Sequence, residues 1–249
     1  MGLREVLQQV WAVAIHVAVG VAAWRARDFD KELVFYGAFH QNPWNQLIHF
    51  VFVPTIWFSF ILLHCYLPVF GFKGLFVPFT NHPVTWGTVQ VLVYLSYYLP
   101  LDPNRGGRVY CLILIALYFL ACRIVSSERD CNVDRAVKKG PAAKPVGDGK
   151  GRRSSMRVYH IAIILQVVSW YMQLHPGHKI CEQVKPALLA SLGQSFGVAP
   201  LFAFYEGVWF AGFEPELHDQ VVAKVAAERR AMCTVRSHPS YNPDYAFCH

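Results

Sequence analysis

Histidine is the residue type in this sequence with the greatest capacity for chemistry. Eleven histidines occur in a chain that is 54% hydrophobic. An ionisable side chain within an apolar membrane segment is costly to bury, so each such histidine is a candidate functional residue. Two groups stand out by their spacing: His40 and His49, which flank Pro43, and His175 and His178, which flank a Pro-Gly pair. A turn at Pro43 would bring the end of one helix beside the first turns of the next.

The second group contains a carboxylate at helical spacing from one histidine. If a helix resumes after Gly177, His178 and Glu182 are four residues apart and share one face. Imidazole and carboxylate ligands together suit a divalent transition metal, including Fe(II) with open coordination positions. Interfacial histidines and a carboxylate that caps a helix would produce the same pattern, so spacing alone leaves both interpretations open.

The other seven histidines have simpler explanations. His16 is isolated within an apolar run. Three histidines lie near the ends of apolar runs, namely His64, His82 and His160. The last three lie in a polar C-terminal tail, where solvation accounts for them: His218, His238 and His249.

The candidate residues lie in a chain with the composition of an integral membrane protein. Charged residues make up 16% of it, against about 25% in soluble domains. A helix of ~19 apolar residues is long enough to cross a bilayer. We therefore expect an all-α, polytopic membrane helical bundle of about five to six spans. The apolar runs occupy residues 6–24, 50–67, 84–99, 109–125, 158–174 and 193–213.

Turn-forming residues predict where several helices begin and end. Asn42 is expected to cap a helix that begins at Pro43, because proline fits the first helical turn. The turn-rich residues 99–107 predict a hairpin between two apolar runs. The His175-Pro176-Gly177 sequence is expected to end the span at 158–174, with an amphipathic interfacial helix after it at 181–192.

Positive charge is concentrated in one loop. Residues 123–157 contain ten Lys or Arg and four Asp or Glu, which accounts for most of the net charge of +7. Since this loop lies between two apolar runs, the positive-inside bias places it in the cytoplasm, and we favour that over nucleic-acid binding. Its part at 140–153 is expected to be disordered. Counting spans from this loop puts His49 and His178 on one membrane face. That face is opposite to the one that carries the loop.

Cysteine usage predicts reduced thiols. The chain has seven cysteines and no CxxC pair, and several cysteines lie in apolar runs. We therefore expect small apolar side chains rather than a disulfide framework or a thiolate zinc site.

Two motifs resemble the yeast-type 2-hydroxy fatty acid dioxygenase family, and the resemblance covers roughly residues 33–213. The first motif is Phe39-His40-Gln41-Asn42-Pro43-Trp44-Asn45, followed by Leu47-Ile48-His49 and Phe52-Val53-Pro54-Thr55. The second consists of Trp170, Gln173, Gly177-His178, Glu182, Pro186-Ala187-Leu188, Leu192, Gln194 and Ala199-Pro200, with Glu206 shortly after.

The resemblance implies a multi-pass endoplasmic-reticulum enzyme that uses Fe(II) and O₂. Its substrate would be a long-chain 2-hydroxy fatty acid, including those from phytosphingosine breakdown, which loses its carboxyl carbon as CO₂. Carried over by residue, the resemblance assigns three histidines to iron, with an acidic and a basic residue as catalytic candidates. These are His40, His49 and His178, then Glu182 and Lys185. His175 falls where this chain holds one residue more than the family pattern, and it is the reserve ligand.

The same resemblance divides the chain into three parts. Residues 1–32 form an apolar helical extension, 33–213 a dioxygenase-like membrane domain that includes a basic loop at 126–157, and 214–249 a polar tail outside the bilayer. The partners of the protein would be the 2-hydroxy fatty acid, O₂ and membrane lipid. No nucleic-acid partner is expected. The sequence does not indicate an oligomeric state.

Two other function classes remain open at this point. A diiron membrane hydroxylase would need several His-rich boxes, and only His175 and His178 are arranged in that style. A non-catalytic membrane scaffold or lipid-binding protein would need no metal for its scattered histidines. Metal analysis of the purified protein separates the three classes. One iron per chain would indicate the dioxygenase, two irons the diiron hydroxylase, and no iron the scaffold.

Overall fold

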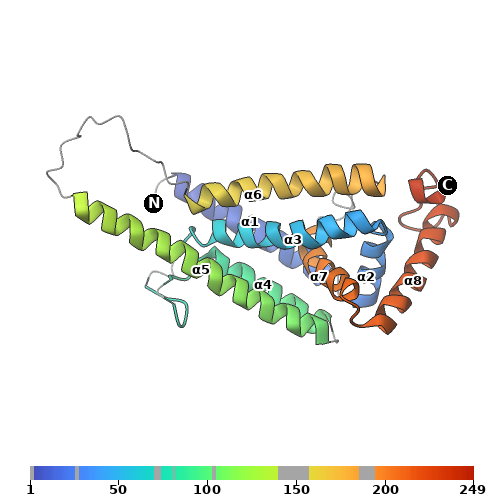
Figure 1. Ribbon diagram of the computed structural model, residues 1–249, viewed down its shortest axis with the longest axis horizontal. Helices are drawn as coiled ribbons and strands as arrows, with labels where there is room; N and C mark the ends of the chain where they lie inside the picture. The colour runs from blue at the N-terminus through green and yellow to red at the C-terminus, as the bar shows by residue number, and fades with distance from the viewer. Residues whose placement is uncertain are drawn as a thin grey trace.

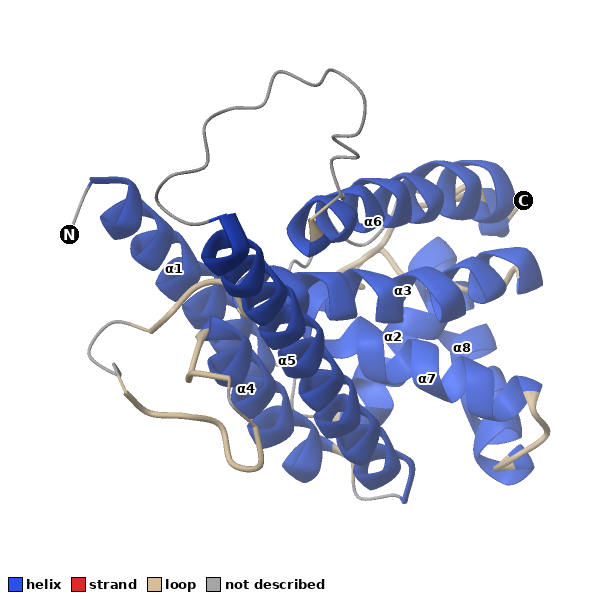
Figure 2. Ribbon diagram, turned by 60° about the vertical axis from the view of Figure 1, so that its left-hand side comes forward, coloured by secondary structure: helices blue, strands red, loops and turns tan. Residues whose placement is uncertain are grey.

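The fold is all-α, as the sequence predicts. The computed structural model describes residues 3–25, 28–69, 74–80, 82–102, 105–139, 157–184 and 194–249. Within these residues the elements are helices, and only two isolated β-bridges interrupt the loops. Figure 2 shows the helices lying side by side in one bundle.

The central element is α3, Pro43–His64, which packs against α4, α5, α6 and α7. Its start confirms the predicted cap, because Asn42 Oδ1 accepts a hydrogen bond from the Trp44 backbone N–H at 2.9 Å. Pro43 occupies the first turn, where its missing N–H would have no helical partner in any case. The predicted helix start at Pro43 is therefore confirmed.

The predicted hairpin is present as α4, Trp86–Leu101, and α5, Arg105–Lys139. The second helix is much longer than its apolar run, which ends near residue 125. No glycine or proline occurs between residues 126 and 139, so nothing in the sequence breaks the helix before Gly140. The first part of the basic loop is thus helical, and the expected disordered part at 140–153 lies outside the described residues.

The predicted end of the next span at Pro176 is wrong. Helix α6, Val158–Met172, continues without interruption into a π-helix, η1, Gln173–Glu182, which contains Pro176. Proline removes one backbone donor and its ring crowds the preceding turn of an α-helix. The wider π turn accommodates both effects, and such turns are frequent at functional sites. The chain leaves η1 at Gln183, which is left-handed with φ of 57°, so the helix expected at 181–192 does not begin at 181. Residues 185–192 of that expected helix lie outside the described residues.

The remaining helices complete the bundle and fold the tail back on it. They are α1, Leu3–Arg25; α2, Phe29–Ala38; the short η3, Gln194–Val198; α7, Ala199–Phe210; α8, Pro215–Thr234; and η4, Ala246–Cys248. Helix α8 packs along α2. Figure 1 shows both at one end of the bundle, whereas the last turns of α5 and the first turns of α6 lie at the other end.

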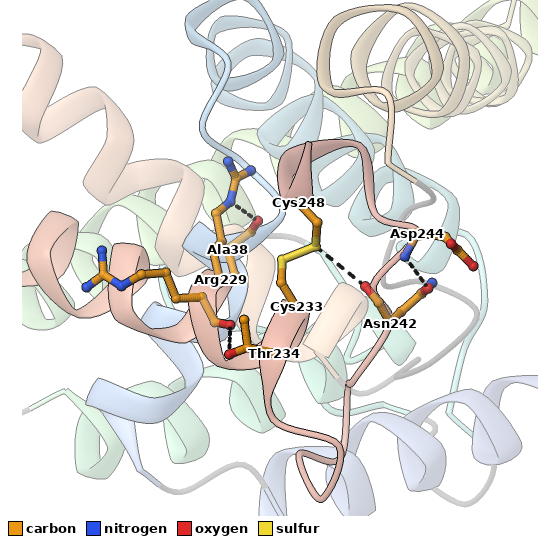
Figure 3. The surroundings of a disulfide bond; sticks show 8 residues. Ala38, Arg229, Cys233, Thr234, Asn242, Asp244 and Cys248 are labelled. Carbon is orange, nitrogen blue, oxygen red and sulfur yellow. Dashed lines mark hydrogen bonds between the residues drawn. A yellow bond between two sulfur atoms is a disulfide. The ribbon is translucent and has the colours of Figure 1, made fainter.

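The interpretation of all seven cysteines as reduced thiols is wrong for two of them. Cys233 and Cys248 form a disulfide across fifteen residues (Figure 3). The backbone turns after α8, and the Asn242 N–H donates to the Met232 carbonyl at 3.0 Å, which returns the chain to the helix end. That tertiary turn, rather than any local spacing motif, brings the two sulfurs together.

Two helices among the described residues are long and apolar enough to cross a membrane, Pro43–His64 and Gly106–Asp130. A third span is possible if the sharply bent pair Phe196–Phe210 and Pro215–Thr234 counts as one. The apolar helices are consistent with a membrane bundle, and the expected number of five to six spans stays a prediction.

Candidate metal centre

Three histidines from three elements converge at the α2 end of the bundle. His40 lies in the turn between α2 and α3, His49 in the second turn of α3, and His178 in η1. One ligand atom from each lies within 4.8 Å of the other two, and their ring centroids are 4.5 to 5.0 Å apart. Residues separated by up to 138 positions thus form one compact group, as expected for a shared metal site.

Backbone hydrogen bonds fix the tautomers of two of these rings. His40 Nδ1 contacts the Tyr36 carbonyl at 2.7 Å, and His49 Nδ1 contacts the Asn45 carbonyl at 2.9 Å. A carbonyl only accepts, so each Nδ1 carries the proton and each Nε2 presents a lone pair. Such an outer hydrogen bond accompanies nearly all metal-bound histidines.

The third ring supplies an independent indication of a metal site. His178 is 4% exposed, and its Nδ1 has no hydrogen-bond partner among the described residues. Buried polar atoms are nearly always satisfied, so an orphaned nitrogen beside two oriented imidazoles needs an explanation. A bound cation provides one, and the donor set fits a divalent transition metal.

The electrostatic setting keeps the histidines neutral. Burial, followed by the nearby His49 and His178, holds the pKa of His40 well below its usual value. Burial, followed by His49, lowers the pKa of His178 to about 3. Imidazole ligates metals in its neutral form, so these rings are already in the ligating state at neutral pH.

Glu182 holds the elements together instead of joining the histidines. Its carboxylate accepts hydrogen bonds from the backbone N–H groups of Gln41, at 3.1 Å, and Asn42, at 2.9 Å, and from Asn45 Nδ2 at 3.2 Å. It also forms an ion pair with Arg229 at 2.6 Å, and the Glu182 side chain is 3% exposed. Glu182 is not part of the three-histidine group, because its oxygens are occupied by the turn that carries His40. Its predicted catalytic role stays a prediction.

Close packing at Gly177 brings η1 onto α3. A Cβ placed there would lie 2.7 Å from Asn45 Oδ1 and 3.5 Å from His49 Cε1. Asn45 is fully buried. Only glycine therefore lets the backbone beside His178 approach the helix that carries His49 this closely.

Two residues at the site were not expected from the sequence. The Tyr36 ring stacks on His40 with centroids 3.8 Å apart, and its hydroxyl donates to Glu206 at 3.4 Å. Tyr36 precedes His40 by four residues, a spacing that a helical reading could have noticed. Arg229, in the tail, had no such local signal.

The remaining predicted residues lie apart from the cluster or beyond the described part of the chain. The ring of His175 stacks on Tyr171, with centroids 5.5 Å apart and planes at 7°, and His175 is not part of the three-histidine group. Lys185 lies outside the described residues, so its predicted role stays a prediction.

An apolar cavity of about 440 Å³ runs between the helices beside this site. Val53 and Trp57 follow His49 at successive intervals of four residues along α3, and both line the cavity. Gln173, five residues before His178, lines it as well. The other walls come from α1, α4, α6, η3 and the first turn of α7.

Comparison with known proteins identifies the family of this chain. The family model described as 2-hydroxy-palmitic acid dioxygenase Mpo1-like matches residues 26–208. The chain belongs to the Mpo1-like family. A curated Mpo1-like relative is the 2-hydroxy-palmitic acid dioxygenase MPO1 of Saccharomyces cerevisiae, which is 30% identical over 190 residues, covering 76% of this chain and 85% of the relative. No solved structure matches.

This result confirms the resemblance drawn from the two motifs. The matched residues include the three clustered histidines, Glu182 and Glu206, whereas Arg229 lies beyond them. The contacts of Glu182 in this chain therefore include one residue outside those that the family model matches.

Proposed function

We propose that this protein is an Fe(II)-dependent dioxygenase that shortens long-chain 2-hydroxy fatty acids by one carbon with release of CO₂. The observation that carries the proposal is the group of three neutral, buried histidines, within a family whose yeast relative is named as a 2-hydroxy-palmitic acid dioxygenase. Three protein ligands leave coordination positions free, which is the arrangement used by non-haem iron oxygenases.

The reaction balances without a keto-acid co-substrate. The substrate, R–CH(OH)–COOH, and one O₂ give R–COOH, CO₂ and H₂O. The bond between C1 and C2 breaks, C2 is oxidised from an alcohol to a carboxylic acid, C1 leaves as CO₂, and O₂ takes up the four electrons. When bound, Fe(II) would supply a chelation site for the hydroxyl and carboxylate of the substrate and a position for O₂.

The protein would contribute neutral ligands, orientation and an apolar chain site. Three uncharged imidazoles leave the positive charge of the metal unneutralised, which favours an anionic substrate. On α3 the lining of the 440 Å³ cavity starts at Val53, one helical turn after His49, and most of the lining side chains are apolar. Each CH₂ removed from water contributes ~0.8 kcal/mol. We place the carboxyl end of the substrate at the histidines and its alkyl chain in the cavity.

Glu182 acts in this proposal as a positioning residue. Its oxygens hold the turn at Gln41 and Asn42 and are balanced by Arg229. Lys185, three residues beyond the end of η1 in the sequence, is proposed to pair with the substrate carboxylate.

We further propose an endoplasmic-reticulum location with the basic loop in the cytoplasm. If α5 and α6 each cross the membrane once, the opposite end of the bundle, which carries the histidines and the tail, faces the lumen (Figure 1). The Cys233–Cys248 disulfide is consistent with that face, because disulfides persist in oxidising compartments. Protease treatment of sealed microsomes should cleave within residues 140–156 from outside, and protection of that segment would overturn this orientation.

The test of function combines metal content with turnover. Purified protein should contain one iron per chain and convert a 2-hydroxy fatty acid to the acid one carbon shorter in the presence of Fe(II) and O₂, without 2-oxoglutarate. The reaction should stop under argon and fail with the non-hydroxylated acid. His178→Ala should remain in the membrane and lose turnover, whereas His175→Ala, in the same π-helix, should retain most of it. Two irons per chain would favour a diiron hydroxylase. Absence of iron, with no shortening of any 2-hydroxy acid over a range of chain lengths, would favour a lipid-binding scaffold.

A further inference from the structure

A second group of metal-ligating side chains lies at the other end of α3. Cys65 directly follows the last residue of that helix, His82 lies in the connection to α4, and Cys122 lies in α5. One ligand atom from each lies within 4.8 Å of the other two, and all three residues are fully buried. Sixteen residues of helix separate Cys65 from His49, a distance of about 24 Å at 1.5 Å per residue. The group is therefore separate from the three-histidine site.

The ring of His82 is oriented as a metal ligand would be. Its Nδ1 contacts the Pro83 carbonyl at 2.8 Å, so Nδ1 carries the proton and Nε2 presents the lone pair. Nε2 is buried and finds no hydrogen-bond partner in the part of the chain that the structure describes. An imidazole held through one nitrogen by a carbonyl, with the other nitrogen buried beside two sulfurs, is the arrangement seen around bound zinc.

The surrounding backbone is built to hold this geometry. The connection from α3 to α4 is closed by hydrogen bonds from Val77 N to the His82 carbonyl, at 2.8 Å, and from Trp86 N to the Leu67 carbonyl, at 2.9 Å. Arg129 from α5 donates to the Cys65 carbonyl at 3.1 Å. These contacts fix the three backbone segments that carry Cys65, His82 and Cys122 relative to one another.

Gly87 and Thr85 complete the pocket around Cys65. A Cβ on Gly87 would lie 2.8 Å from Cys65 Sγ, so the absence of a side chain there leaves room for the sulfur. Thr85 is fully buried, and it forms a capping box with Thr88 at the start of α4. The pocket thus contains two thiols, one orphaned imidazole nitrogen and a buried hydroxyl in an otherwise apolar region.

We propose that Cys65, His82 and Cys122 bind one Zn²⁺ ion. The ion would cross-link the end of α3 and the α3–α4 connection to α5. Two thiolates and one neutral imidazole form a donor set that suits zinc, and Thr85 Oγ1 or a water molecule takes the fourth position. Binding releases two thiol protons to solvent. The two thiolate charges then cancel the charge of the ion, so the site adds no net charge to the apolar bundle. The sequence alone argued against a thiolate zinc site, because the three ligands come from segments without a CxxC spacing.

Metal analysis of variants of the full-length protein provides the test. The wild-type protein, purified without added chelator, should contain about one zinc per chain in addition to iron. His82→Ala and Cys122→Ser should each lower the zinc content at least tenfold and leave the iron content unchanged. Cys111→Ser is the matched control, since Cys111 is a buried cysteine on the same helix outside the group, and it should retain zinc. His40→Ala should show the opposite result, with iron lost and zinc retained.

A spectroscopic measurement on the wild-type protein covers the case in which a variant fails to fold. Metal-depleted protein titrated with Co²⁺ should develop the charge-transfer absorption that requires thiolate ligands, and prior addition of Zn²⁺ should abolish it. Three results would overturn the proposal: a wild-type protein without zinc that shows no cobalt–thiolate band, a Cys65–Cys122 disulfide in freshly purified protein, or zinc lost from His40→Ala and retained in Cys122→Ser. None of these outcomes depends on fatty-acid turnover, so the zinc site and the proposed reaction can fail separately.

Discussion

Removal of Arg229 tests whether the tail helix holds the metal centre in place. Its guanidinium pairs with Glu182 at 2.6 Å, donates to the Ala38 carbonyl at 2.8 Å, and lies 4.4 Å above the Phe247 ring. Figure 3 shows this arginine beside the disulfide that ties the chain end to α8. Arg229→Ala would leave the carboxylate of Glu182 buried with backbone and amide donors but no counter-charge.

The expected cost follows from the burial of the pair. The Glu182 side chain is 3% exposed and that of Arg229 is 21% exposed. Breaking a buried ion pair by removing one partner costs about 3–5 kcal/mol. Since Glu182 keeps hydrogen bonds from Gln41, Asn42 and Asn45, we expect the lower end, about 3 kcal/mol. In a chain of this size that corresponds to a fall in Tm of about 6–12 °C. Because Glu182 holds the turn that carries His40, the same variant should also weaken iron binding relative to the wild type.

A control on the same helix and a double variant make the test specific. Lys224 of α8 pairs with Asp30 of α2, but both side chains are about half exposed, so Lys224→Ala should cost no more than about 1 kcal/mol. Glu182→Gln combined with Arg229→Ala removes the unpaired charge, so the double variant should be destabilised less than the sum of the two single variants. Thermal melts and iron titrations in detergent measure these effects. If Arg229→Ala melts like Lys224→Ala and binds iron like the wild type, α8 does not support the site.

Three further predictions follow from individual contacts. Gly177→Ala should displace the buried Asn45, because its Cβ would lie 2.7 Å from Oδ1, and we expect at least a tenfold loss of iron affinity; unchanged affinity in an iron titration would contradict the role of this close approach. In metal-free protein the pKa of His178 is lowered to about 3 from an ordinary value of 6.5, so below pH 6.5 the unfolded state binds more protons and stability is lost as the pH falls toward 3. His178→Ala should reduce the slope of unfolding free energy against pH by about 1.4 kcal/mol per pH unit. Denaturant melts between pH 4 and pH 6 measure this slope. An unaltered slope would mean that His178 is not buried as a neutral ring. Cys233→Ser opens a loop of fifteen residues and should cost about 3 kcal/mol and expose the tail to protease; Cys181→Ser is the control, and equal protection of the two variants would contradict the disulfide.

The local part of the site could be predicted from the sequence because short-range rules govern it. Asn42 and Pro43 specify a helix start through capping and a fixed φ, and this places His40 and His49 on either side of one turn. Long apolar runs specify helices, since burial of apolar surface and internal hydrogen bonding both require them in a membrane. Tyr36, one helical turn before His40, belongs to the same short-range pattern.

Only the tertiary structure decided which residues from distant segments pack against the turn between His40 and His49. Local rules end a helix near Pro176, yet packing of Gly177 on α3 and the wider π turn carry the chain onward and bring His178 to His40 and His49. Glu182 and Arg229 meet only because α8 folds back along α2. Cys65, His82 and Cys122 likewise lie on three separate segments. No local preference records such contacts, because their free energy comes from packing between segments that are distant in sequence.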